Sequence, residues 1–110
     1  MAERFEYRFE WDPTKAARNA KEHGVTFEQA ATVFLDARLL SQVDEEHGTD
    51  EERWRSLGLD KSARLLVVCH TYRHETARSA TIRIVSARKG TRREANDYEK
   101  GTHEKGIRLL

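Results

Sequence analysis

Hydrophobic and polar residues alternate along several segments of the chain. In residues 4–10 (RFEYRFE), aromatic residues occupy every second position and charged residues occupy the others. This period of two is typical of a strand with one buried face. Residues 77–88 (ARSATIRIVSAR) alternate in the same way, whereas residues 64–72 (RLLVVCHTY) are apolar on both faces. We predict three strands here and place 64–72 in the centre of the sheet, because only a central strand buries both faces.

A first helix is predicted directly after the opening strand. Asp12 precedes Pro13, which is the pairing expected for a helix cap followed by the first helical residue. The helix should run to about His23, where Gly24 can adopt the left-handed conformation that ends many helices.

Two further helices are predicted from capping boxes, in which a Thr and a residue three positions later bond each other's backbone N–H groups. Thr26 with Gln29 begins a short amphipathic helix that reaches Phe34. Thr91 with Glu94 begins a last helix, which extends through Tyr98 and ends at Gly101.

The remaining segments carry weaker signals. Residues 38–43 (RLLSQV) indicate a strand, and residues 51–57 fit a strand or a helix equally well. Residues 73–76 (RHET) are expected to connect a hairpin, and the tail at 102–110 is expected to be ordered only in part. The order of elements predicts one small α+β domain over residues 1–110, with a mostly antiparallel sheet, two N-terminal helices and a C-terminal helix.

Charge is abundant and unevenly distributed. Charged residues make up 35% of the 110 residues, against about 25% in typical globular proteins. The net charge of +1 combines −6 over residues 1–60 with +7 over residues 61–110. The basic half holds Arg73, Arg78, Arg83, Arg88, Lys89, Arg92 and Arg93 within 21 positions. Arginine forms bidentate contacts with phosphate, so this cluster indicates nucleic acid, although a merely solvated basic face remains the alternative.

Composition excludes several other classes. With one cysteine, Cys69, neither an intrachain disulfide nor a thiol-based metal site can form, and its mid-strand position predicts a buried structural thiol. No apolar stretch is long enough to span a bilayer, and the charged N-terminus does not fit a signal peptide. We expect an intracellular protein that needs no cofactor or metal.

Arg83 is the strongest candidate for phosphate chemistry. It lies between Ile82 and Ile84 in a predicted strand, and a strand holds a guanidinium more rigidly than a loop does. Arg73 and Arg88 flank the same strands and could converge on the same phosphate. The alternative is an edge-strand arginine whose aliphatic stem covers apolar surface.

RNA cleavage without a metal also needs groups that transfer protons. His23 is available, although a helix cap is its simpler interpretation, and Glu51 stands near Arg53 in what could equally be a solvated charged run. His70 and His74 are four residues apart on a strand and its connection, which is a weak zinc signal. These alternatives stay open on the residues alone.

A family resemblance narrows the alternatives. The segment FEWDPTKAARNAKEHGVTFEQAATVF, from Phe9 to Phe34, resembles the N-terminal signature of BrnT-type toxins. An acidic stretch with His47, the motif EERW, RLLVVCHTYR and IRIVSARKGTRREANDYE follow in the family's order. The resemblance covers about residues 9–99.

The resemblance implies a fold similar to the RelE toxins and a ribonuclease toxin of a type II toxin–antitoxin module. Such toxins are cytoplasmic, cleave RNA and arrest growth. A BrnA-like antitoxin neutralises them, and they meet operator DNA only through the antitoxin complex.

The resemblance places recurrent polar residues of the family at His23, Glu51, Arg53, Arg73, Arg83, Arg88 and Lys89, and leaves open which of them transfers protons. We expect Glu51 or His23 to transfer protons and Arg53, Arg73 and Arg83 to hold the scissile phosphate, while Arg88, Lys89, Arg92 and Arg93 guide the RNA backbone. Two alternatives remain: a module of the same fold that binds RNA or a partner without cutting, and a metal-dependent nuclease.

Overall fold

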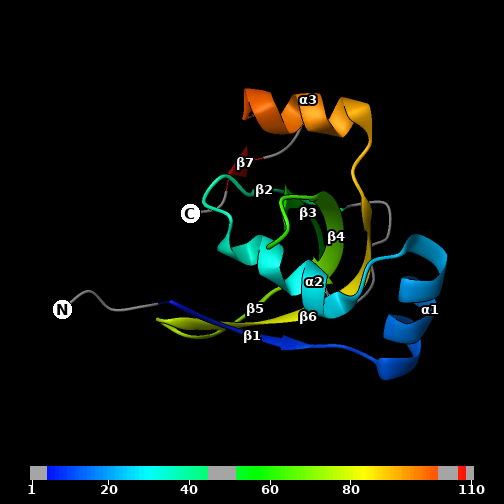
Figure 1. Cartoon of the computed structure of the whole chain (residues 1–110). Helices are drawn as coiled ribbons and strands as arrows, with labels where there is room; N and C mark the ends of the chain where they lie inside the picture. Colours follow the sequence, from blue (N-terminus) through cyan, green and yellow to red (C-terminus); the bar gives the residue numbers. More distant parts are fainter. Residues whose placement is uncertain (1–4, 45–51, 102–106, 109–110) are drawn as a thin grey trace.

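The computed structural model describes residues 5–44, 52–101 and 107–108. Glu51, His47 and most of the tail at 102–110 therefore lie outside the described residues. Within them the chain forms the α+β arrangement expected from the sequence, with helices α1, α2 and α3, a short 3₁₀ segment η1, and strands β1 to β7 (Figure 1).

All three predicted helices are present and their local signals act as expected. Helix α1 spans Pro13–His23; the Asp12 carboxylate accepts from the Thr14 amide at 2.7 Å, and Gly24 ends the helix at φ 68°. Helix α2 spans Phe27–Ala31 and continues as η1 over Thr32–Leu35. Helix α3 spans Arg92–Lys100, and both predicted capping boxes are formed.

The described residues contain one sheet of seven strands. Its order is β1-β6-β4-β3-β2-β7, with β5 pairing β6 separately. Only β1 runs parallel to its neighbour, β6, and β4 is central as predicted. The strand bounds are Glu6–Glu10 for β1, Leu40–Val43 for β2, Arg53–Leu59 for β3, Leu65–Thr71 for β4, Arg73–Thr76 for β5, Ser79–Lys89 for β6 and Ile107–Arg108 for β7.

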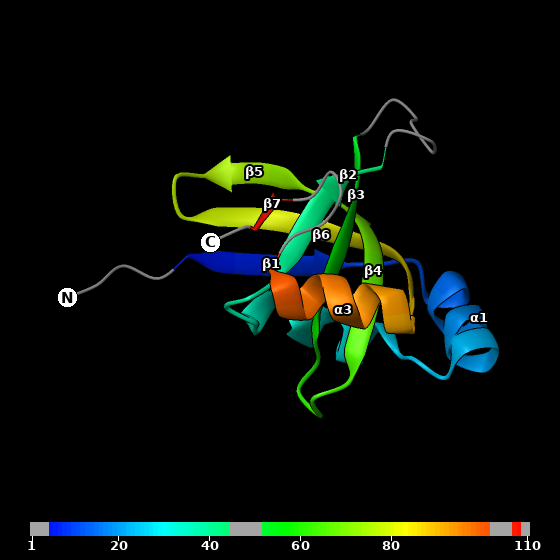
Figure 2. The same cartoon turned by 90° about the horizontal axis from the view of Figure 1, so that it is seen from above.

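Strand β6 is long enough to serve two parts of the sheet. Its first half pairs with β1 and β5, and its second half pairs with β4. We call the three-stranded part made by β1, β5 and the first half of β6 the arm. Figure 2 shows the strands of the arm running across the direction of β2, β3 and β4.

Helices cover the two faces of the sheet unequally. The main core lies beneath α2 and η1, where Phe27 and Val33 pack against Leu66, Val68 and Ile82. A smaller core of Leu40, Leu57, Val67 and Tyr98 lies on the opposite face, beneath α3. Figure 1 shows α3 and α2 on opposite sides of β3 and β4, and α1 beside the end of the sheet.

Helix α1 is fastened to the edge of β6 by one buried side chain. The Asn19 amide donates to the carbonyl oxygens of Ala87 at 2.8 Å and Val25 at 2.9 Å, and its own oxygen accepts from the Ala87 amide at 3.0 Å. Strand β1 pairs with β6 only as far as Arg83, so Asn19 takes over the edge of β6 where β1 has ended.

The structure resolves one undecided segment and corrects two predictions. Residues 53–59 form strand β3. Residues 73–76 are strand β5 and not a connection, because they pair with β6 and leave the turn to residues 77–78. Cys69 is half-buried and not fully buried, because α3 covers the sheet only as far as Val67 on this strand.

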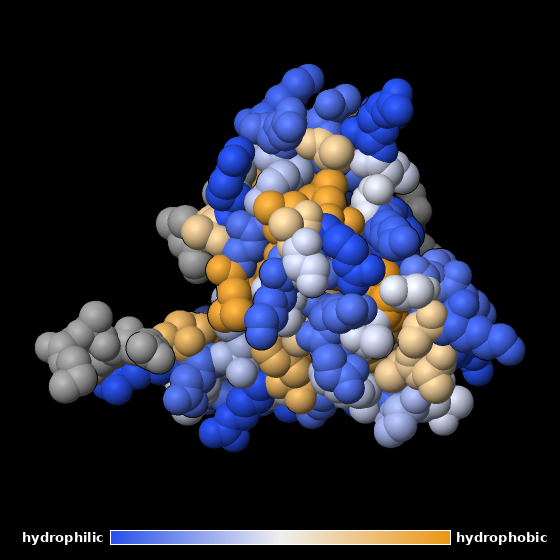
Figure 3. All heavy atoms as spheres, viewed as in Figure 1, coloured by the Kyte–Doolittle hydropathy of each residue, from blue (hydrophilic) through white to orange (hydrophobic). Residues whose placement is uncertain are grey.

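The face seen in Figure 3 is largely hydrophilic. On the face seen in Figure 3, hydrophobic residues come to the surface mainly between α3 and α2. None of the described helices is long and apolar enough to cross a membrane.

Candidate active site

Strand alternation sorts the side chains of the sheet onto two faces. On β6, Ile82 and Ile84 enter the core beneath α2, so Arg83 points to the opposite face. We call this opposite face, where α3 leaves it uncovered, the open face. Its described residues include Arg8, Glu10, Arg53, Arg55, Cys69, Thr71, Arg73, Glu75, Thr81, Arg83 and Ser86.

Three of the predicted arginines come together on the open face. Arg53 on β3 is paired with Thr71 on β4. The pairs His70–Ile84 and Arg73–Thr81 share one register, which places Thr71 opposite Arg83 on β6. Because neighbouring strands are about 4.8 Å apart, the Cα atoms of Arg53 and Arg83 are about 10 Å apart with Thr71 between them. Arg73 lies two positions beyond Thr71, so all three side chains can reach one anion.

Carboxylates accompany these arginines. Glu10 faces Arg83 across β1 and β6 with a closest distance of 3.7 Å. Arg73 donates from Nε to Glu75 at 2.8 Å. The hydrogen bond from Arg73, and then that from Thr81, holds the pKa of Glu75 below its ordinary value. Glu10, Arg73, Glu75 and Thr81 line one shallow hollow on the arm.

Arg88 is engaged with α3. Its guanidinium makes a bidentate pair with Glu94, at 2.8 and 2.9 Å. This pair is the main reason that the pKa of Glu94 falls to about 2. Lys89, Arg92 and Arg93 are exposed at the junction of β6 and α3, where they extend the cationic surface.

The structure does not bring His23 to the three arginines. His23 ends α1 beside Val85 and Ser86, with Glu22 at 4.0 Å. Glu51 lies outside the described residues, so its placement relative to Arg53 stays a prediction. The Arg53 side chain makes no hydrogen bond or ion pair with the residues that the structure describes.

A chain of buried polar side chains lies on the core side of the sheet, behind Thr71. His70 is fully buried, and its Nδ1 donates to the Thr71 carbonyl at 2.9 Å. Its Nε2 therefore accepts from the Ser56 hydroxyl at 2.7 Å, and Ser56 contacts Ser41 at 2.6 Å. Burial lowers the pKa of His70 to about 4, so the ring is neutral at pH 7. Both ring nitrogens are engaged, which leaves none for a zinc ion.

Sequence reasoning missed several polar residues of the open face. Glu10 and Arg8 fall opposite the aromatic positions of the first strand, so its alternation could have identified them. Thr71, Glu75 and Thr81 were missed because β5 was not recognised, and its pairing with β6 is what brings them together. Among the described residues, no group of three or more His, Cys, Asp or Glu is arranged to hold a metal ion.

The comparisons with known proteins agree with one another. A family model described as the ribonuclease toxin BrnT of type II toxin–antitoxin systems matches residues 11–94. The crystal structure of the Brucella abortus ribonuclease toxin BrnT is similar with a TM-score of 0.53 and 18% sequence identity, and the match covers 79% of this chain and 100% of that chain.

The structural similarity supports the α+β fold alone, and the predicted likeness to RelE toxins stays a prediction. No curated protein matches the chain in sequence. The family model, however, covers well over half of the 110 residues. The chain therefore belongs to the BrnT family of ribonuclease toxins of type II toxin–antitoxin systems.

Proposed function

We propose that the chain is a metal-independent endoribonuclease whose open face binds the scissile phosphate of RNA. The supporting observation is that Arg53 on β3, Arg73 on β5 and Arg83 on β6 lie around Thr71 on β4. Strands hold these side chains in position before the substrate arrives, which is the condition for efficient electrostatic stabilisation of a transition state.

The proposed reaction uses the substrate's own nucleophile. A base removes the proton from the ribose 2′-hydroxyl, the oxygen attacks the neighbouring phosphorus, and the bond to the 5′-oxygen breaks as an acid protonates it. The products are a 2′,3′-cyclic phosphate and a 5′-hydroxyl. Negative charge accumulates on the phosphate oxygens in the transition state, and the three guanidinium groups stabilise it.

Proton transfer is assigned here to Glu51 or His23, two positions that match recurrent polar residues of the family. Glu10 and Glu75 are two further candidates, because they already lie beside Arg83 and Arg73. The lowered pKa of Glu75 keeps it ionised at pH 7, as a proton acceptor must be.

The backbone of the RNA is proposed to continue over the junction of β6 and α3. Lys89, Arg92 and Arg93 are exposed there and can contact further phosphates. Arg88 can join them only by sharing its guanidinium with Glu94.

Membership of a type II family implies an antitoxin partner. We propose that this partner is BrnA-like, that the toxin meets operator DNA only through the complex, and that both proteins act in the cytoplasm. An acidic segment of the antitoxin would neutralise the cationic surface by charge complementarity.

Cleavage of single-stranded RNA in EDTA tests the nuclease. We expect 2′,3′-cyclic phosphate and 5′-hydroxyl ends, and no cleavage at a nucleotide that carries 2′-deoxyribose. Arg83→Ala should lower the rate about 100-fold or more, because it removes one preorganised charge from the transition state. Arg78→Ala, in the turn before β6, is the control and should cleave normally.

Normal cleavage by a folded Arg83→Ala protein would remove this residue from the proposed site, and loss of cleavage on chelation would favour a metal-dependent nuclease. RNA binding without any cleavage would favour the non-cutting module. In cells, the chain expressed alone should stop growth, and co-expression of its neighbouring gene should restore it.

A further inference from the structure

Helix α1 and the second half of β6 enclose a shallow groove beside the open face. It is lined by Lys15, Arg18, Asn19, Glu22, His23, Val85 and Ser86. The two walls are fixed to each other, because the Asn19 side chain is hydrogen-bonded to the backbone N–H and carbonyl of Ala87. The groove therefore exists before any ligand binds.

A bulge in β6 shapes the floor of this groove. His70 is paired with Ile84 but the preceding residue, Cys69, is paired with Ser86, so Val85 is an extra residue on β6. A bulge re-aims the side chains next to it. Here Val85 and Ser86 both line the groove, and the Ser86 side chain makes no hydrogen bond to the described residues.

The groove is lined mainly by hydrogen-bond donors. Lys15 and Arg18 are exposed and make no ion pair with described residues. In contrast, Arg73, Arg83 and Arg88 each have a carboxylate within 4 Å. Glu22 is the one acid in the lining, and it lies against His23.

The groove begins next to the proposed phosphate site. The Asp12 carboxylate caps α1 and interacts electrostatically with both Lys15 and Arg83. Its backbone hydrogen bonds lower its pKa most, and the charges of these two cations lower it further. A polyanion held at Arg83 can thus pass Lys15 and continue along α1 to Arg18.

We propose that this groove binds a second phosphate of the RNA, next to the scissile one, through Lys15, Arg18 and the Ser86 hydroxyl. The inference rests on the proposed function, because Arg83 must hold the scissile phosphate for the RNA strand to enter the groove. An RNA phosphate fits better than a protein segment, because the lining offers Val85 as its only large apolar side chain and protein interfaces depend on buried apolar anchors.

Binding of an uncleavable RNA tests the groove separately from the chemistry. The probe is a single-stranded 2′-O-methyl oligonucleotide, whose Kd is measured at a series of salt concentrations. Each lost phosphate contact should reduce the slope of log K against log salt by about 0.7. We expect this reduction for Lys15→Ala and Arg18→Ala and a similar increase for Glu22→Lys.

Lys21→Ala is the matched control, because Lys21 lies on the same helix but does not line the groove. Unchanged slopes for Lys15→Ala and Arg18→Ala, with normal thermal unfolding, would overturn the proposal. So would weaker antitoxin binding with unchanged RNA binding, which would assign the groove to the protein partner. If the wild type cuts no RNA while the slopes shift as expected, the groove stands and the nuclease proposal fails.

Discussion

His70 combines complete burial with a titratable ring. Both ring nitrogens are hydrogen-bonded, one to the Thr71 carbonyl and one to the Ser56 hydroxyl. The Phe34 ring packs edge-on against the imidazole, with 4.9 Å between the ring centroids. These contacts suit the neutral ring. Protonation would turn Nε2 into a donor facing the Ser56 hydroxyl and would place a charge in the core.

The buried ring predicts how stability depends on pH. The pKa of His70 is about 4 in the folded protein, while an unfolded histidine titrates near 6.5. Since the unfolded chain then binds the proton more tightly, the free energy of unfolding should decrease as pH falls from about 6.5 to 4, by up to about 3 kcal/mol. Urea unfolding across this range measures the decrease.

His70→Gln should flatten this pH dependence even if the variant is less stable at every pH. The exposed His74 provides the control, because His74→Gln should leave the slope as in the wild type. Equal slopes in the wild type and His70→Gln would mean that another group causes the dependence.

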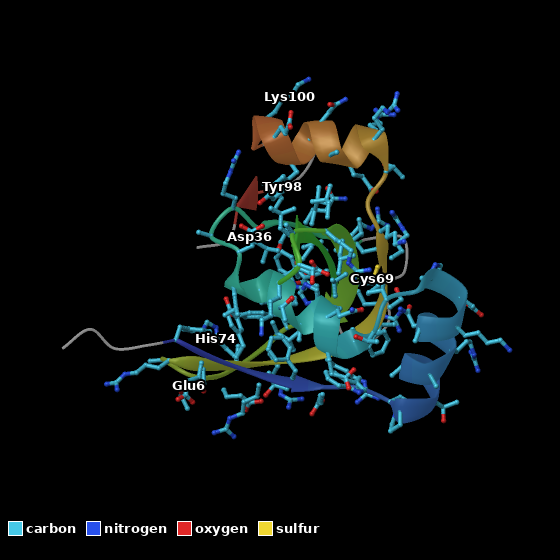
Figure 4. All side chains as sticks on the ribbon, in the orientation of Figure 1. Glu6, Asp36, Cys69, His74, Tyr98 and Lys100 are labelled. Carbon is cyan, nitrogen blue, oxygen red and sulfur yellow. The ribbon has the colours of Figure 1, made fainter. Side chains whose placement is uncertain are left out.

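At the scale of elements, polar contacts add to the packing of Tyr98 in attaching α3 to the sheet. The Tyr98 hydroxyl donates to the Asp36 carboxylate at 2.6 Å, and this carboxylate also accepts from the Leu59 amide. Figure 4 shows Tyr98 pointing from α3 toward Asp36. The pair between Arg88 and Glu94 fixes the other end of the helix.

Removing the Tyr98 hydroxyl should loosen α3. Tyr98→Phe loses a hydrogen bond to a charged acceptor and leaves Asp36 with one donor fewer, which should cost about 1.5–3 kcal/mol. Amide hydrogen exchange in α3 should become about tenfold faster or more. Exchange in β4 should accelerate only as far as the lower free energy of global unfolding requires. Tyr72→Phe is the control, because the Tyr72 hydroxyl has no hydrogen bond to the described residues. Unchanged exchange in Tyr98→Phe would show that packing alone holds α3.

The elements that could be predicted from sequence are those determined locally. The three helices carry their own caps at Asp12, Thr26 and Thr91, so neighbouring residues were sufficient to locate them. Strand β5 was missed because all four of its residues are exposed and polar, and only its pairing with β6 makes it a strand. Strand β3 stayed undecided because charged residues occupy one of its faces at the start of the strand.

The same distinction applies to the candidate site. Strand alternation predicted that Arg83 projects from the sheet. The neighbourhood of Arg53, Thr71 and Arg83 depends on pairing between strands far apart in sequence. Of the carboxylates beside the arginines, Glu10 reaches Arg83 only through the pairing of β1 with β6, whereas Glu75 is two residues from Arg73 on the same strand.

At the scale of the whole molecule, the open face extends from the arm to the parts of β3 and β4 that α3 does not cover. Cys69, which is labelled in Figure 4, lies on it. Its pairing with Ser86 places it between the arginines of the arm and Arg88 along β6. Because this is the chain's one cysteine and its side chain is half-buried, a thiol reagent can report on this face at a single position.

Bound RNA should protect Cys69 from a maleimide. With uncleavable RNA at ten times its Kd, the labelling rate should fall about tenfold, because only the free protein reacts. Protein unfolded in urea is the control and should react equally with and without RNA. An unchanged rate for the folded protein at saturating RNA would place the RNA on another face.

The bonds between Asn19 and Ala87 have a consequence for self-association. A single amide supplies the donor and acceptor that a neighbouring strand would offer, at the point where β1 leaves the edge of β6. An exposed strand edge invites pairing with other chains and aggregation. Asn19 therefore closes this edge to a second copy of the protein, and a sheet extended between molecules would have to begin elsewhere, such as at the outer edge of β1.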